Sequence, residues 1–275
     1  MKKLALTSLI AMFTVAGAHA ANVIDGNPLY MPKKGHFYSV TALGSHSGKQ
    51  DIKAWNLDEE FGYGITDKFS VNVATQIQDQ RSFDQWEWAG ASFDLTFRAF
   101  DMGGWKMDLI GKYAVDPVWG NRRPFLEKDD TDYTWSAGVR GGYTNARFTV
   151  AGHAIFNYEN TESFNWNEDA GKRGKHTLEL GLDGQLVLDN NWNLVAGVEY
   201  TGRLDSKDRG SDLPADKIKN AGKWQGTFGV NYNIDTTKFV GAYVSADMNH
   251  RGGTNHDEWE VENGFGFGAK FGIDF

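Results

Sequence analysis

The sequence predicts an all-β protein: a transmembrane, antiparallel, up-and-down β-barrel of about twelve strands, preceded by a signal peptide. Three observations predict this fold. Segments of about ten residues, the length that a tilted strand needs to cross the hydrocarbon, alternate apolar and polar side chains. The connections between these segments are alternately short and long. The last strand keeps one face apolar up to Phe275.

The expected strands follow one another along the whole chain after a short lead. They cover residues 36–44, 53–65, a third segment that begins at 69, and then 86–100, 105–115, 132–143, 147–158, 175–188, 192–202, 223–234, 238–249 and 259–275. Between ten and fourteen strands would fit the pattern, and bacterial barrels have an even number. A one-residue slip would exchange the two faces of a strand, so the apolar positions decide which side chains point inward.

The apolar positions are assigned to the outer face, strand by strand. From the second strand to the tenth they include Trp55, Leu57, Phe61, Tyr63 and Ile65; Phe69, Val71, Val73 and Ile77; Ala91, Phe93, Leu95 and Phe97; Trp105, Met107, Leu109, Tyr113 and Val115; Tyr133, Trp135, Ala137 and Val139; Phe148, Val150, Ala154, Phe156 and Tyr158; Leu178, Leu180, Leu182, Leu186 and Leu188; Trp192, Leu194, Ala196, Val198 and Tyr200; and Trp224, Phe228, Val230, Tyr232 and Ile234. Glu59 and Asn263 are polar residues at outward positions, and we place both near strand ends.

The outward face is less obvious in the eleventh expected strand than in the twelfth. Both faces of segment 238–249 are apolar, and we take Val240, Ala242, Val244 and Ala246 as outward. Segment 259–275 has one strictly apolar face, formed by Phe265, Phe267, Ala269, Phe271, Ile273 and Phe275, and its other face is glycine or charged. Period-two alternation of this kind indicates a strand with lipid or core on one side only.

The connections alternate in length. Five short turns are expected at residues 66–68, 101–104, 144–146, 189–191 and 235–237, and they are rich in the Asp, Asn, Gly and Thr of tight turns. Six longer loops are expected at 45–52, 79–85, 116–131, 159–174, 203–222 and 250–258. This alternation is typical of barrels with short periplasmic turns and long extracellular loops. The strands of a soluble β-sandwich also alternate apolar and polar side chains. A sandwich gives no reason, however, for connections that are alternately short and long.

The N-terminal residues predict a secreted protein. Lys2 and Lys3 precede an apolar stretch at 4–15, and Ala18-His19-Ala20 is a small-x-small cleavage site. We therefore expect a signal peptide at residues 1–20, a periplasmic lead segment at 21–35 with Pro28 and Pro32, and an outer-membrane barrel at 36–275.

The composition excludes several classes of function. Without Lys2 and Lys3, the 28 basic residues become 26 against 36 acidic ones, a net charge of −10 that argues against nucleic-acid binding. The chain has no cysteine, so disulfides, thiolate metal sites and a cysteine nucleophile are absent. Mean hydropathy is −0.50 although 14% of residues are aromatic. A barrel explains this combination, because only alternate residues face the lipid.

The inward faces carry the residues that could act on solutes. By parity we predict as pore-lining Asp58, Glu60, Asp94, Arg98, Lys106, Asp108, Lys112, Arg140, His153, Glu179, Asp183, Glu199, Asp247, Glu260, Glu262 and Lys270. Arginine and lysine gather on the strands at 86–143, and acids dominate elsewhere. Opposed walls would set a transverse field across an open pore. The alternative is that Asp94, Arg98, Asp108 and Lys112 pair with their neighbours and fill the lumen.

Catalytic and metal motifs are weak. The mature chain has His36, His46, His153, His176, His250 and His256, and none has a spacing typical of a catalytic dyad. A single inward histidine such as His153 belongs more often to a polar network than to a catalytic base. The acidic loop at 205–216 lacks the regular spacing of a calcium loop. We therefore expect no enzyme, no cofactor and no metal site.

The chain resembles Gram-negative outer-membrane β-barrels in three places. Its ends carry the signal peptide and Phe275, and residues 59–71 (EEFGYGITDKFSV) are similar to a hairpin that is common in proteobacterial barrel proteins, including transporter-like ones linked with aromatic degradation. The resemblance implies an outer-membrane location in contact with lipid and lipopolysaccharide. It also implies that Phe275 is part of the signal read by the barrel-assembly machinery. It is specific for the class of barrel and transfers no functional residue.

The function expected from these observations is passive diffusion of small polar or cationic solutes through a polar lumen. The barrel would be monomeric or loosely oligomeric, and the sequence favours the monomer without deciding between them. Three alternatives stay open. A structural or adhesive surface barrel would have a plugged lumen. A barrel hydrolase would need His153 or His176 beside a carboxylate and a hydroxyl. A transporter of hydrophobic solutes would need an apolar lumen, which the inward faces argue against.

Overall fold

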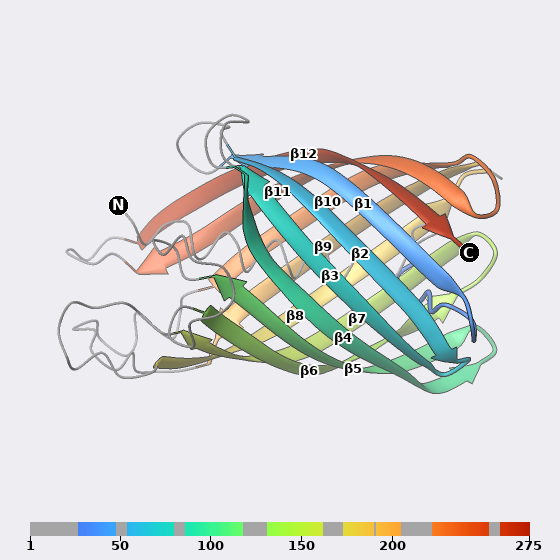
Figure 1. Ribbon diagram of the computed structural model, residues 1–275, viewed down its shortest axis with the longest axis horizontal. Helices are drawn as coiled ribbons and strands as arrows, with labels where there is room; N and C mark the ends of the chain where they lie inside the picture. The colour runs from blue at the N-terminus through green and yellow to red at the C-terminus, as the bar shows by residue number, and fades with distance from the viewer. Residues whose placement is uncertain are drawn as a thin grey trace.

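The computed structural model describes residues 27–47, 54–79, 86–117, 131–161, 173–189, 191–204, 222–252 and 259–275. These residues form one closed antiparallel barrel of twelve strands (Figure 1). The strands are β1 (Phe37–Ser47), β2 (Ala54–Thr66), β3 (Phe69–Asp79), β4 (Trp86–Met102), β5 (Trp105–Pro117), β6 (Thr131–Thr144), β7 (Phe148–Thr161), β8 (Arg173–Val187), β9 (Trp192–Arg203), β10 (Gly222–Asn233), β11 (Lys238–Gly252) and β12 (Trp259–Asp274).

Each strand pairs with its neighbours in sequence, and β1 pairs with β12 to close the sheet. Closure satisfies the backbone groups of every strand, which is the condition for crossing a bilayer with strands. The predicted fold class and strand number are therefore confirmed, and strand ends differ from the predicted ones by a few residues. In the described part of the chain, no helix is long and apolar enough to cross a membrane.

The outer face is apolar, as the period-two pattern predicted. Large hydrophobic side chains are exposed on all twelve strands, including Phe61 on β2, Trp135 on β6, Leu182 on β8 and Phe271 on β12. On β11, Val240 and Val244 are exposed while Phe239 is 1% exposed, which confirms the register chosen for that strand. An exterior of this kind is stable against lipid and would be unstable in water.

Two local features were not predicted from the pattern. A register shift between Gln76 and Ile77 lies opposite Gly90, whose φ of 143° favours glycine, and a second shift lies between Arg98 and Phe100. Glu59, expected near a strand end, lies within β2 on the outer face. Its carboxylate accepts hydrogen bonds from Ser39 Oγ at 2.6 Å and Thr41 Oγ1 at 2.5 Å. These two hydroxyls partly compensate the charge of an outward-facing carboxylate.

The five short connections lie together at one end of the barrel, called here the short-turn end (right in Figure 1). Asn145, Asp189 and Asp235 each accept a hydrogen bond from a backbone N–H two residues ahead. The backbone and hydroxyl of Thr237 hold the pKa of Asp235 below its usual value. The central parts of the six predicted long loops, and the predicted signal peptide, lie outside the described residues.

Residues 27–35, predicted to be a periplasmic extension, contact the barrel at the short-turn end. Leu29 is 1% exposed, and its carbonyl accepts a hydrogen bond of 2.6 Å from Arg98 Nη2 on β4. Asn27 Nδ2 donates to Thr144 at the end of β6, while the Tyr30 hydroxyl donates to Asp274 at the end of β12. In the closed barrel, β6 and β12 lie across from each other. The segment therefore spans the short-turn end of the barrel.

Candidate functional site

The inner face of the barrel is polar and closely packed. Of the predicted pore-lining residues, Glu60, Asp94, Arg98, Asp108, Arg140, His153, Glu179, Asp183 and Asp247 are buried, and Asp58, Lys106, Lys112, Glu199 and Lys270 are half-buried. The side chains of Glu260 and Glu262 lie outside the described residues. Burial of so many charges requires that they interact with one another.

The first charged group lies near the short-turn end, on β4, β5 and β6. Asp108, fully buried, accepts hydrogen bonds from Arg98 Nε at 2.8 Å and from Arg140 Nη2 at 2.9 Å. The two guanidiniums thus share one carboxylate, and Arg98 also reaches Leu29 of the N-terminal segment. This group ties three strands and the N-terminal segment together.

The remaining basic side chains of this wall are also paired. Lys106 Nζ lies 2.9 Å from Asp101, and Lys112 Nζ lies 4.0 Å from Asp94. The predicted positive wall is therefore largely neutralised by its own carboxylates, and the hypothesis of two oppositely charged walls needs correction. The pairing of Asp94, Arg98, Asp108 and Lys112 with their neighbours was the alternative drawn from the sequence, and the structure has these ion pairs.

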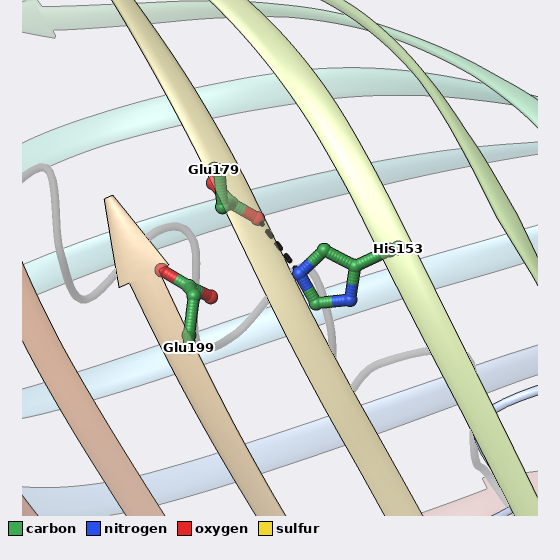
Figure 2. Close-up of side chains that lie close together, drawn as sticks. All are labelled: His153, Glu179 and Glu199. Carbon is green, nitrogen blue, oxygen red and sulfur yellow. Dashed lines mark ion pairs between the residues drawn. The ribbon is translucent and has the colours of Figure 1, made fainter. Parts of the chain in front are cut away.

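The second group lies near the middle of β7, β8 and β9 (Figure 2). His153 and Glu199 are both register partners of Gly181, one on each side of β8, and Glu179 is two residues along the same strand. His153 Nε2 lies 3.2 Å from Glu179 Oε1, and Nδ1 lies 3.2 Å from Asp183 Oδ2. One ligand atom from each of His153, Glu179 and Glu199 lies within 4.8 Å of the others. The described inner side chains of these strands include no lysine or arginine.

A third group lies beside the second on β10 and β11. Lys223 Nζ lies 3.3 Å from Asp247 Oδ2, and Gln225 Nε2 donates to Asp247 Oδ1 at 2.7 Å. Lys223 was not among the predicted inner residues. Its parity with Gln225, opposite to that of the outward Trp224, was the signal that could have placed it.

On the remaining inner wall, aromatic side chains lie over glycines. Tyr38 covers Gly62, Phe239 covers Gly272, and the Tyr38 hydroxyl donates to Glu60 Oε1 at 2.5 Å. Nearby, Gln76 Nε2 donates to Asp58 at 2.6 Å. The ammonium of Lys270 lies 5.6 Å from the centre of the Phe239 ring. The rings of Tyr38 and Phe239 are buried, and they need the glycines because a side chain there would occupy the same space.

We expect Gly62→Ala to destabilise the barrel by about 1–3 kcal/mol, because the new methyl group would overlap the ring of Tyr38. The matched control is Gly226→Ala, since a Cβ at Gly226 meets no atom within 4 Å. The measurement is the free energy of unfolding in denaturant of the refolded protein in lipid vesicles. Equal stability of the two variants would show that the Tyr38 ring does not depend on Gly62.

The second histidine considered as a catalytic candidate lies elsewhere. His176 stacks against Phe156 and Tyr158, with ring centres 5.6 and 5.1 Å apart, and Phe156 is exposed on the outer face. His176 is therefore separated by the wall of the barrel from the inward Glu179. Of the two histidines considered for the hydrolase alternative, only His153 lies on the inner face.

Neither protein-family models nor curated proteins give a match to this chain. Solved structures do. The NanC porin has a TM-score of 0.54 at 10% identity, covering 84% of this chain and 98% of its own. The chain has the fold of an outer-membrane β-barrel. The translocator domain of the autotransporter NalP from Neisseria meningitidis has a TM-score of 0.58 at 12% identity, covering 98% of this chain and 97% of its own.

A third similar barrel is an outer-membrane channel from Pseudomonas putida F1, with a TM-score of 0.58 at 10% identity over 89% of this chain and 97% of its own. At these identities, the similarity confirms the class of outer-membrane β-barrel that the sequence resembled and identifies no residue of common function. The function of this outer-membrane β-barrel has to be argued from its own inner wall.

Proposed function

We propose that this chain is a narrow outer-membrane channel through which small polar solutes diffuse, with a preference for cations. The observation that carries the proposal is the inner wall of β7, β8 and β9. Glu179, Asp183 and Glu199 face the lumen there with one imidazole among them, whereas the basic side chains of β4 to β6 are already paired. The carboxylates of this wall outnumber its cationic side chains, and an excess of negative charge raises the local concentration of cations and repels anions.

The proposed mechanism is diffusion through a polar passage without a cofactor or a catalytic step. A solute exchanges part of its hydration shell for the carboxylates and amides of the inner wall, and the narrow lumen limits its size. The short turns face the periplasm, and the outer face contacts lipid and lipopolysaccharide. We propose that the protein acts as a monomer and not as an enzyme. Two similar solved barrels are named as a porin and a channel, which agrees with this proposal.

A second candidate function is a structural surface barrel with a closed lumen. It is favoured by the N-terminal segment across the short-turn end, where Leu29 is buried against Arg98. The two candidates make opposite predictions for transport. A channel passes ions and small solutes in a purified system, while a closed barrel passes neither and keeps its role in its surface loops.

The test is solute efflux from vesicles that contain the refolded mature chain. We expect a small cationic amino acid to leave faster than an anionic one of similar size. In the triple variant Glu179→Gln, Asp183→Asn, Glu199→Gln, that difference should largely disappear, because the wall loses its charge. The control is Glu59→Gln, which removes a carboxylate from the outer face.

Two results would count against the proposed function. No efflux of any solute from vesicles with folded barrel would support the closed structural barrel. An unchanged cation preference in the triple variant, equal to that of Glu59→Gln, would show that other residues set the selectivity.

A further inference from the structure

The cluster on β7, β8 and β9 has a geometry that a simple charged wall does not require. Gly181 lies between His153 and Glu199 in the sheet, and a Cβ at Gly181 would overlap the imidazole ring of His153. The ring therefore lies over the glycine and points across β8 towards the two glutamates (Figure 2). The absence of a side chain at this position is what lets residues of three strands meet.

The two nitrogens of the His153 imidazole have different surroundings. Nδ1 lies 3.2 Å from Asp183 Oδ2, and this contact orients the ring so that Nε2 faces Glu179. Nε2 is buried and has no hydrogen-bond partner among the described residues, and its side chain is only 4% exposed. Glu179 Oε1 lies 3.2 Å away, but this contact lacks the geometry of a hydrogen bond.

Three carboxylates surround this one ring. The side chain of Glu179 is only 3% exposed, and it forms an ion pair with His153. It also interacts electrostatically with Glu199 and with Lys223. Lys223, on the adjacent strand β10, is paired with Asp247. In this cluster the buried carboxylates outnumber the cationic side chains, so a divalent cation between them would stabilise it.

We propose that His153, Glu179 and Glu199 bind one divalent transition-metal ion of the zinc type inside the lumen, and that Asp183 orients the imidazole. A nitrogen with two carboxylate oxygens is a ligand set that zinc accepts, whereas calcium and magnesium take oxygen ligands and do not need an imidazole. A carboxylate behind the histidine is the usual arrangement at such sites. The donor atoms lie within 4.8 Å of one another.

This inference goes beyond the proposed channel, because binding requires only the folded barrel. The test is a titration of the mature chain, refolded in detergent micelles, with Zn²⁺ in competition with a chromophoric chelator. We expect one ion bound per barrel, not displaced by excess Mg²⁺ or Ca²⁺. Titration with Co²⁺ should give visible d–d absorption that reports a nitrogen and oxygen ligand set.

The variants separate this site from other carboxylates. Asp183→Asn should weaken Zn²⁺ binding by roughly 10- to 100-fold, and removal of a ligand in His153→Gln or Glu199→Gln should weaken it further. Gly181→Ala changes no donor atom but should also weaken binding, because the methyl group displaces the ring. The control is His36→Gln, a half-exposed histidine at the short-turn end.

Three outcomes would overturn the proposal. The first is the absence of saturable Zn²⁺ binding by folded protein, and the second is unchanged affinity in both His153→Gln and Glu199→Gln. The third is displacement by Mg²⁺ at similar concentration. If His153→Gln loses its heat-modifiable migration and has not folded, Glu199→Gln decides, since it leaves the contact of His153 with Glu179. Metal binding by a barrel that passes no solute would contradict the channel and leave this site in place.

Discussion

Asp108→Ala is expected to lower the free energy of unfolding by about 3–5 kcal/mol, because the variant leaves two buried guanidiniums without their shared carboxylate. Arg98 and Arg140 are each 6% exposed, so water offers them little compensation. The measurement is denaturant unfolding of the refolded barrel in lipid vesicles, monitored by tryptophan fluorescence.

The matched control for Asp108 is Asp101→Ala, which removes a half-exposed carboxylate at the same end of the barrel. Asp101 lies 2.9 Å from Lys106 Nζ and 3.8 Å from Arg98 Nη1, so its contact with Arg98 is longer than that of Asp108. We expect this control to cost less than about 1 kcal/mol, as is usual for surface ion pairs. If the two variants lose equal stability, the Arg98–Asp108–Arg140 group does not contribute to holding β4, β5 and β6 together.

Deletion of residues 21–34 is expected to raise the single-channel conductance by roughly two- to fivefold, because it removes the segment that spans the short-turn end of the lumen. Leu29, Asn27 and Tyr30 hold this segment through contacts with β4, β6 and β12. The measurement is conductance in planar bilayers at one salt concentration, compared with that of the complete mature chain.

The control for this deletion removes residues 21–26 only, which leaves the described segment in place. Its conductance should equal that of the complete mature chain. An unchanged conductance after removal of residues 21–34 would mean that the narrowest part of the lumen lies elsewhere, at the level of Tyr38 and Phe239 or of the carboxylate cluster.

The sequence predicts the strands well because one physical rule controls them: a strand between lipid and lumen must alternate. Phe265, Phe267 and Phe271 are exposed, as their period-two spacing indicated. This rule does not locate the bulge at Gly90. A bulge changes the local backbone geometry but not the composition of the strand. It also gives no information on residues 27–35, whose position depends on distant partners such as Arg98.

The candidate site was predictable only in part. Parity placed His153, Glu179 and Glu199 on the inner face, but these residues are far apart in sequence and no spacing connects them. Their meeting depends on the register that makes His153 and Glu199 partners of the same glycine. The register between two strands depends on the lengths of the turns and on the closure of the whole barrel. The sequence of a single strand does not contain this information. The same registers decide the charge pairing of Arg98 and Lys112, which the sequence left open as one of two alternatives.

The most direct test of the central claim is single-channel recording from the refolded mature chain in a planar bilayer with a salt gradient. We expect a small, steady conductance and a reversal potential whose sign indicates a preference for cations. That preference should weaken as salt rises from about 0.1 M to about 1 M, where the Debye length falls to about 3 Å. Silent bilayers from folded barrel, or a reversal potential of the sign for anion preference, would contradict it.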